Sequence, residues 1–134
     1  MRLECPSLLI TDDDRDFRDT LRHVFEPRFR TLVAGDGEEA LAIVRSQEIH
    51  LVLLDMHMPK LTGLETLRRM KEFRARLPCI LISAGLDESL IRQAELAKAF
   101  SVLAKPVSRQ QLTGTVEAAM RGTYDWPGGE LAPN

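Results

Sequence analysis

Five short apolar runs recur along this chain, and stretches with helical periodicity separate them. The runs span residues 7–11, 30–34, 50–56, 79–83 and 100–104. Each is nearly continuous in apolar character, which is typical of parallel strands covered on both faces. Regular alternation of strands and helices predicts an α/β fold, and five strands are too few to close a parallel barrel. We therefore expect an open, doubly wound parallel sheet of five strands with five helices on its two faces.

The length and composition fit a single domain. The chain has 134 residues, and 44% of them are hydrophobic, which is enough for one packed core. After residue 121 the sequence turns to Pro, Gly and polar residues, so we predict a domain at 1–121 and a C-terminal tail or linker at 122–134. Within that tail, Tyr124 and Trp126 are the residues expected to contact the domain.

The charge balance argues against a nucleic-acid or membrane surface, because both favour a basic excess and the formal net charge is −2. Residues 68–76 are rich in Arg and Lys, but they fall on a predicted helix, where a solvated face is the simpler explanation. No apolar run approaches the ~20 residues of a membrane span, and we identify no secretion signal. Cys5 and Cys79 lack metal-ligand spacing. A disulfide between them stays open, but we favour a reducing cytoplasm with Cys79 buried in the core.

Polar residues mark the ends of four of the five predicted strands. In chain order they are Asp12 and Asp13 after the first, Asp55 on the third, Ser83 on the fourth and Lys105 after the fifth. The carboxyl ends of parallel strands share one edge of an open sheet, where ligands bind. Three carboxylates without nearby Cys or His form a hard oxygen site of the kind that suits Mg²⁺. The pattern therefore predicts a magnesium site with an ammonium group beside it.

These acids also have ordinary structural explanations. Asp is a favoured helix N-cap, so Asp12, Asp13 and Asp14 could simply begin the helix that follows. We assign that role to Asp14 alone, because the other two align with the polar ends of the remaining strands. Asp55 could be a turn residue, but a carboxylate that ends a strongly apolar strand needs a charged or hydrogen-bonding partner. A carboxylate can also act as a nucleophile toward a phosphoryl group.

The segments around these residues resemble the receiver domain of two-component response regulators. They are LLITDDD (8–14), LLDMHMPKLTG (53–63), ILISAG (80–85) and VLAKPVS (102–108). The resemblance spans roughly residues 6–121, and the ordered set is far more specific than any one segment. It implies a flavodoxin-like sheet with the strand order 2-1-3-4-5.

Carried over position by position, the resemblance implies roles for individual residues. It implies Mg²⁺ ligands at Asp12, Asp13, Asp55 and the backbone carbonyl of His57. It also implies a phosphoacceptor at Asp55, a switch hydroxyl at Ser83, and a phosphate-binding lysine at Lys105 with a cis bond to Pro106. The His57 side chain is expected to lie exposed in the loop.

The function implied by the resemblance is a signalling switch rather than a metabolic enzyme. A sensor histidine kinase or a histidine phosphotransfer protein would donate a phosphoryl group to Asp55 with Mg²⁺ as cofactor. The domain would catalyse its own phosphorylation and dephosphorylation and would signal to a downstream protein target or an effector domain. A phosphorylation-dependent dimer stays open, whereas direct binding to nucleic acid or a membrane is not expected.

One position departs from the family pattern. Three residues before the lysine, the family commonly has an aromatic side chain that moves inward with the switch hydroxyl, whereas this chain has Val102. A β-branched side chain has few rotamers and cannot report the state by a large swing. We therefore expect the output of the switch either to be weaker or to use a different readout.

Two other functions compete with this interpretation. The first is a receiver that binds its partners without accepting phosphate. The second is a haloacid-dehalogenase-like phosphatase with Asp12 as nucleophile. The second leaves Asp55 without a role, and its later metal-binding acid would have to be Asp125 in the tail, which is a poor candidate.

Overall fold

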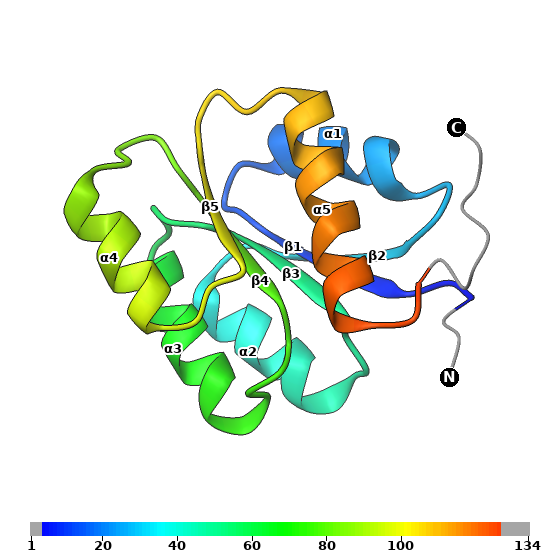
Figure 1. Ribbon diagram of the computed structural model, residues 1–134, viewed down its shortest axis with the longest axis horizontal. Helices are drawn as coiled ribbons and strands as arrows, with labels where there is room; N and C mark the ends of the chain where they lie inside the picture. Colours follow the sequence, from blue (N-terminus) through cyan, green and yellow to red (C-terminus); the bar gives the residue numbers. More distant parts are fainter. Residues whose placement is uncertain (1–3, 127–134) are drawn as a thin grey trace.

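Five parallel strands form one open sheet in the order β2-β1-β3-β4-β5, which confirms the predicted topology (Figure 1). The computed structural model describes residues 4–126 of the chain. Its strands are β1 (Ser7–Thr11), β2 (Arg30–Ala34), β3 (Leu51–Asp55), β4 (Cys79–Ser83) and β5 (Ser101–Ala104). Two predicted runs were one residue too long at their starts, at His50 and Phe100, and the third run also extended past Asp55.

Five helices cover the two faces of the sheet. They are α1 (Arg15–Phe25), α2 (Gly37–Ser46), α3 (Gly63–Phe73), α4 (Glu88–Leu96) and α5 (Arg109–Thr123). Helices α1 and α5 lie on one face, and α2, α3 and α4 lie on the other (Figure 1). Each helix begins after a side chain that accepts a hydrogen bond from an N–H of the first turn, as N-caps do. The caps are Asp14, Asp36, Thr62, Asp87 and Ser108.

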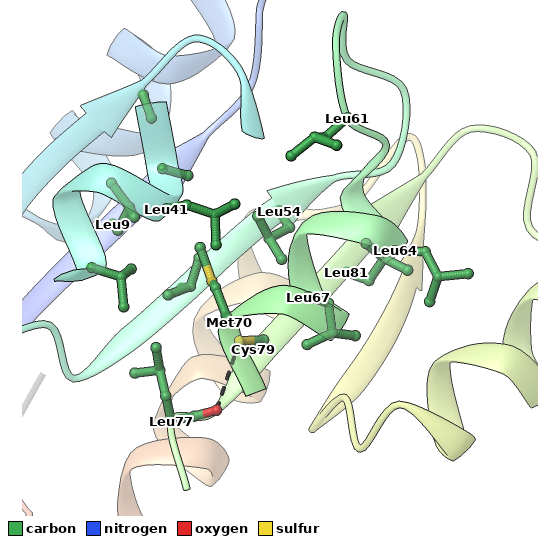
Figure 2. Packing of buried hydrophobic residues seen from close by; sticks show 14 of the residues in the cluster. Leu9, Leu41, Leu54, Leu61, Leu64, Leu67, Met70, Leu77, Cys79 and Leu81 are labelled. Carbon is green, nitrogen blue, oxygen red and sulfur yellow. Dashed lines mark hydrogen bonds between the residues drawn. The ribbon is translucent and has the colours of Figure 1, made fainter. Parts of the chain in front are cut away.

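Alternate residues of the central strands enter separate cores on the two faces. Leu9, Leu54 and Leu81 pack beneath α2 and α3 in the core shown in Figure 2. Their strand neighbours belong to the core beneath α1 and α5. Cys79 is fully buried in the first core, and burial raises the pKa of its thiol to about 12. Both cysteines are free thiols, so the alternative of a disulfide is excluded and the buried position of Cys79 is confirmed.

The basic stretch at residues 68–76 lies on the outer face of α3 and in the turn after it. Leu64, Leu67 and Met70 of the same helix are buried, whereas Arg68 and Arg69 are exposed. The helix is therefore amphipathic, and its arginines form a solvated face as predicted. Within residues 4–126, no helix has the length and apolar character needed to cross a bilayer.

Helix α5 ends at Thr123, two residues beyond the predicted domain boundary, and the segment after it packs on the domain. Tyr124 donates a hydrogen bond of 2.7 Å from its hydroxyl to the backbone oxygen of His50. Trp126 is buried, with its ring 5.3 Å from that of Phe29. The expected contacts of both aromatic residues are thus confirmed, while residues 127–134 of the predicted tail lie outside the described part.

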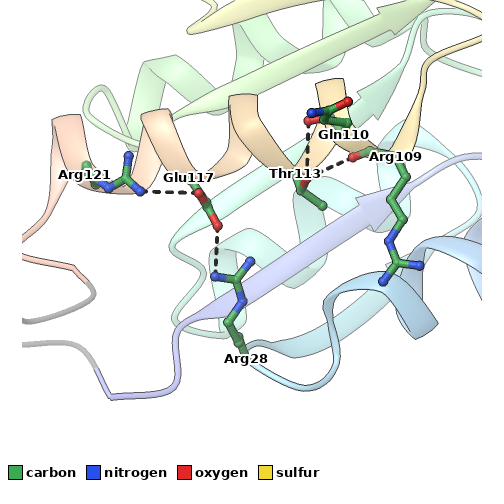
Figure 3. Close-up of polar contacts among 6 residues, drawn as sticks. All are labelled: Arg28, Arg109, Gln110, Thr113, Glu117 and Arg121. Atoms are coloured by element: carbon green, nitrogen blue, oxygen red, sulfur yellow. Dashed lines mark hydrogen bonds and ion pairs between the residues drawn. The ribbon is translucent and has the colours of Figure 1, made fainter. Parts of the chain in front are cut away.

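An ion-pair network fixes α5 against the segment between α1 and β2. Arg28 lies 3.0 Å from one carboxylate oxygen of Glu117, and Arg121 lies 3.3 Å from the other (Figure 3). Thr113 bonds back to the carbonyl of Arg109 within the same helix. The side chains of Arg28, Glu117 and Arg121 are 30%, 24% and 51% exposed, so water still screens these ion pairs and their contribution to stability is modest.

We expect the stability of the protein to fall between about pH 7.5 and about pH 5.5 because of His50. The His50 ring is buried, and its Nδ1 accepts a hydrogen bond of 2.9 Å from Ser7 N–H. Burial lowers the pKa of His50, and the exposed Glu48 only partly offsets this. Since the folded pKa lies below the unfolded value, the stabilisation is complete above the unfolded pKa and is lost as the pH falls from there through the folded pKa.

Urea denaturation at the two pH values measures this effect. His50→Gln should be less stable than the wild type at the higher pH but should show a flatter dependence on pH. His23→Gln, which removes an exposed histidine on α1, should keep the wild-type slope. Equal slopes for the wild type and His50→Gln would contradict the assignment.

Candidate functional site

The sheet topology brings the predicted site residues to one edge. Asp12 follows β1, Asp55 ends β3, Ser83 ends β4 and Lys105 follows β5, and all these strands run in the same direction. Backbone hydrogen bonds continue the ladder past the strand ends, from Asp12 N–H to Ala34 and from Lys105 N–H to Ser83. The positions of the side chains are therefore set by the rigid sheet rather than by flexible loops.

Lys105 pairs with two carboxylates. Its Nζ lies 2.8 Å from Asp55 Oδ1 and 3.5 Å from Asp12 Oδ2. Both carboxylates are buried, with 5% of Asp55 and 2% of Asp12 exposed, so little water screens the attraction. Apart from this ion pair, Asp55 Oδ1 has no hydrogen-bond partner among the residues that the structure describes. One buried carboxylate oxygen thus retains capacity for a further ligand.

Asp12, Asp13 and Asp55 together could hold a metal ion. Each offers one carboxylate oxygen, and these oxygens all lie within 4.8 Å of one another. Asp12 and Asp13 can face the same point because the chain leaves the regular strand at Thr11. An all-oxygen donor set of this kind suits Mg²⁺ or another hard divalent cation. The donor chemistry and the free capacity of Asp55 therefore fit the ion expected from the sequence.

The pKa values of Asp12 and Lys105 reflect both burial and the excess of negative charge at the site. Burial raises the pKa of Asp12, and the charge of Asp55 adds to this; the Asp14 N–H and Lys105 offset it only in part. Burial lowers the pKa of Lys105, but the two carboxylates outweigh burial and hold it above its ordinary value. Lys105 therefore stays an ammonium, and one ammonium does not balance the acids around it. A bound cation would relieve this imbalance.

Asp14 has the structural role predicted for it. Its Oδ1 accepts hydrogen bonds from Asp16 N–H at 3.0 Å and from Phe17 N–H at 3.3 Å at the start of α1. The third acid of the triplet is thus the helix cap, whereas the first two face the site. This division of roles within three adjacent identical residues follows from the break between strand and helix.

Ser83 and His57 both line a small pocket. The pocket has a volume of about 250 Å³, and Ser83, His57, Gly85 and Gln93 are among its lining residues. Ser83 is fully buried, and its hydroxyl oxygen accepts a hydrogen bond of 3.1 Å from Gly85 N–H. His57 is exposed in the loop after β3, as expected. Because a hydroxyl can donate as well as accept, Ser83 can still donate its own hydrogen to a further acceptor.

The loop after Asp55 has a tight, irregular backbone. Gly63 N–H donates to Met56 O at 2.9 Å, and Leu61 N–H donates to Pro59 O around Lys60, whose φ is 72°. A non-glycine residue in this region is uncommon and costs backbone strain. The Lys60 ammonium lies 3.5 Å from Asp36 at the start of α2. No pattern in the sequence indicates this contact between the two loops.

Two further features concern the segment that carries Lys105. The peptide bond between Lys105 and Pro106 is cis, which confirms the expectation. The Lys105 ammonium also lies 4.8 Å from the centroid of the Phe17 ring. Val102, on β5, is partly buried against the core beneath α2, α3 and α4.

Comparison with known proteins gives consistent results. A family model of the response regulator receiver domain matches residues 8–117. The chain is 31% identical over 118 residues to the transcriptional regulatory protein CpxR of Klebsiella pneumoniae, covering 87% of this chain and 50% of CpxR. It is 32% identical over 111 residues to sporulation initiation phosphotransferase F of Bacillus subtilis, covering 82% of this chain and 90% of that protein. The chain thus spans half the length of CpxR but most of the phosphotransferase.

Solved structures share the fold. A CheY-like receiver domain protein from Methanospirillum hungatei superposes with a TM-score of 0.86 at 22% identity, over 89% of this chain and 96% of that one. The CheX–CheY–BeF3–Mg complex from Borrelia burgdorferi matches with a TM-score of 0.80 at 30% identity, over 84% of this chain and 87% of that one. The first comparison concerns the fold alone, and the second is with a complex that contains magnesium.

Proposed function

Because this chain belongs to the family of response regulator receiver domains, we propose that it is a switch that accepts a phosphoryl group on Asp55. The observation that carries the proposal is the environment of this carboxylate. Asp55 lies at the edge of the sheet, 2.8 Å from the Lys105 ammonium and within reach of the oxygens of Asp12 and Asp13. A buried nucleophile beside a fixed cation and a metal-binding acid pair is suited to phosphoryl transfer.

The proposed reaction transfers the phosphoryl group from a partner's phosphohistidine. An Asp55 carboxylate oxygen forms the new O–P bond as the N–P bond breaks, and the bonding electron pair returns to the histidine nitrogen. Lys105 moves its ammonium from the Asp55 carboxylate toward the phosphoryl oxygens. Mg²⁺, held by Asp12, Asp13, Asp55 and the His57 carbonyl, would supply further neutralisation of the transferred charge. Hydrolysis of the acyl phosphate would later regenerate Asp55.

Ser83 is the proposed link between phosphorylation and output. Its hydroxyl would donate a hydrogen bond to a phosphoryl oxygen, so the contact with Gly85 N–H would be lost and the loop into α4 would shift. Val102 pairs with Leu81 in the neighbouring strand and has no aromatic ring to move. We therefore assign the readout to the loop before α4 and to α4 itself.

The proposed partners follow from the family. A sensor histidine kinase or histidine phosphotransfer protein would be the donor, and a downstream protein or an effector domain would be the target. Regulators such as CpxR and HoxA are named for transcriptional control, and the chain spans 50% and 24% of their lengths. The part that matches them is the receiver, so any contact with DNA would belong to an effector domain. A cytoplasmic location is part of the proposal.

The phosphatase alternative has little geometric support. The acid that it would need after the lysine, Asp125, follows α5 beside Tyr124, which contacts His50 just before β3 begins. That end of the sheet is opposite the edge where Asp12 and Asp55 lie. The receiver proposal, in contrast, uses all the polar residues that converge at this edge.

Intact mass after incubation with acetyl phosphate and Mg²⁺ tests the proposal. We expect a single phosphoryl adduct with Mg²⁺ and at least about tenfold less adduct when EDTA replaces it, because the acids then repel the incoming phosphate. Peptide mapping of the adduct should place it on the segment that contains Asp55. An absence of adduct under both conditions would instead favour an interaction module that does not take phosphate.

A further inference from the structure

The Phe17 ring lies against the Lys105 ammonium, from a different element and a different part of the sequence. The distance from Lys105 Nζ to the ring centroid is 4.8 Å, within the range of cation–π attraction. Phe17 is in the first turn of α1, and its N–H bonds to the Asp14 cap. The ring is partly buried against the core beneath α1 and α5. Both the cap and the core therefore restrict where this ring can point.

The ammonium thus has three neighbours that attract it. Asp55 Oδ1 lies at 2.8 Å, Asp12 Oδ2 at 3.5 Å and the Phe17 ring at 4.8 Å. The side chain of Lys105 is 29% exposed, so the attraction to the ring is not fully screened by water. A lysine side chain has four flexible torsions and would otherwise sample many directions. The ring restricts the directions that the Lys105 side chain can sample and keeps its ammonium above the edge of the sheet.

The role of the ring differs from that of the carboxylates. When the acids share a divalent cation, their attraction for Lys105 weakens, because part of their charge is already neutralised. The negative face of the aromatic ring is unaffected by that change. At the moment when Lys105 must turn from Asp55 to a phosphoryl group, the Phe17 ring is the neighbour that still attracts the ammonium.

We propose that Phe17 is a positioning residue for phosphoryl transfer, which acts by holding the Lys105 ammonium above Asp55. The proposal rests on the proposed phosphoacceptor function and deepens it. Phe17 itself touches no reacting atom.

The test compares side chains with and without an aromatic face. Phe17→Leu and Phe17→Met keep apolar bulk and remove the ring, whereas Phe17→Tyr keeps it. Phe73→Leu is the matched control. The Phe73 ring, at the C-terminal end of α3, lies 4.8 Å from the guanidinium of Arg45 in α2, which is the same distance as that between Phe17 and Lys105. Phe73 is the last residue of its helix and is distant from the strand ends at the site.

The first measurement does not depend on phosphorylation. The proton shifts of the Lys105 ε-methylene, assigned by their absence in Lys105→Arg, should show an upfield ring-current shift in the wild type. The shift should persist in Phe17→Tyr and Phe73→Leu and disappear in Phe17→Leu and Phe17→Met. Unperturbed shifts in the wild type would overturn the proposed contact even if a variant failed to fold.

The second measurement is the rate of phosphorylation by acetyl phosphate at saturating donor and Mg²⁺. Phe17→Leu and Phe17→Met should lose about three- to tenfold in maximal rate, with donor KM and Mg²⁺ affinity within about twofold of the wild type. Phe17→Tyr and Phe73→Leu should retain the wild-type rate. A wild-type rate in Phe17→Leu, or a loss in Phe17→Tyr as large as that in Phe17→Leu, would overturn the role of the ring. No phosphorylation of the wild type would overturn the proposed function and the role in transfer together.

Discussion

Replacing Asp55 by Asn is expected to abolish the phosphoryl adduct formed with acetyl phosphate and Mg²⁺, with a loss of at least about a hundredfold. The amide lacks the negative charge and the nucleophilic oxygen of the carboxylate but has nearly the same shape. Only 5% of Asp55 is exposed, so a change of shape here would disturb the core, whereas Asn should not. Lys105 keeps Asp12 as a partner at 3.5 Å. The measurement is intact mass, with circular dichroism to confirm folding.

Two other aspartates make this experiment decisive. Asp14→Asn is the matched control, since Asn caps helices as well as Asp does and the side chain lies outside the acid cluster. It should keep the wild-type adduct. Asp12→Asn removes a proposed metal ligand, so it should slow the reaction and raise the Mg²⁺ requirement while the adduct stays on Asp55. An adduct that survives Asp55→Asn and disappears in Asp12→Asn would instead support the phosphatase-like alternative.

The fold was largely predictable because the apolar pattern and the parallel topology constrain each other. Strands covered on both faces need continuous apolar runs, and the runs at 7–11, 30–34 and 79–83 coincide with β1, β2 and β4. The predicted strands differ from the observed ones at residues that directly adjoin a strand and bond to its neighbours. His50 binds backbone groups through its ring and carbonyl just before β3, and Phe100, 42% exposed, bonds to Cys79 before β5 begins. Only the register of the neighbouring strand decides such boundaries.

The residues of the site that lie at strand ends could be predicted from the sequence, because the sheet topology determines where strand ends meet. The sheet brings Asp12, Asp55 and Lys105 to the same edge, so the topology rule was sufficient to group these residues. Phe17 could not be found in the same way, because its contact depends on the rotation of α1 about its own axis. The contact of Lys60 depends on its left-handed backbone conformation and on the distance to Asp36 in another loop. Contacts between a helix or loop and the sheet edge are decided by packing, which periodicity does not encode.

Gly63→Ala is expected to destabilise the protein by about 2–4 kcal/mol. A Cβ at this position would overlap the backbone oxygen of Asp55 and would lie 2.7 Å from Leu81 Cδ1 and 2.9 Å from Met56 Cα. Two of these neighbours are backbone atoms at the end of β3, which cannot move without disturbing the sheet. Gly114→Ala in α5 is the control, since nothing lies within 4 Å of its added Cβ. That change should stabilise the protein by about 0.5–1 kcal/mol, as Ala does in helices.

Urea denaturation of the two variants separates a steric effect from a general effect of replacing glycine. If both variants changed stability in the same direction, the close approach of α3 to Asp55 would not be the cause. The steric explanation also has a consequence for function. Gly63 N–H holds the Met56 carbonyl at 2.9 Å, so relief of the overlap must shift either α3 or the backbone of Asp55. We therefore expect Gly63→Ala to slow phosphorylation as well as to destabilise the fold, even under conditions in which the protein remains folded.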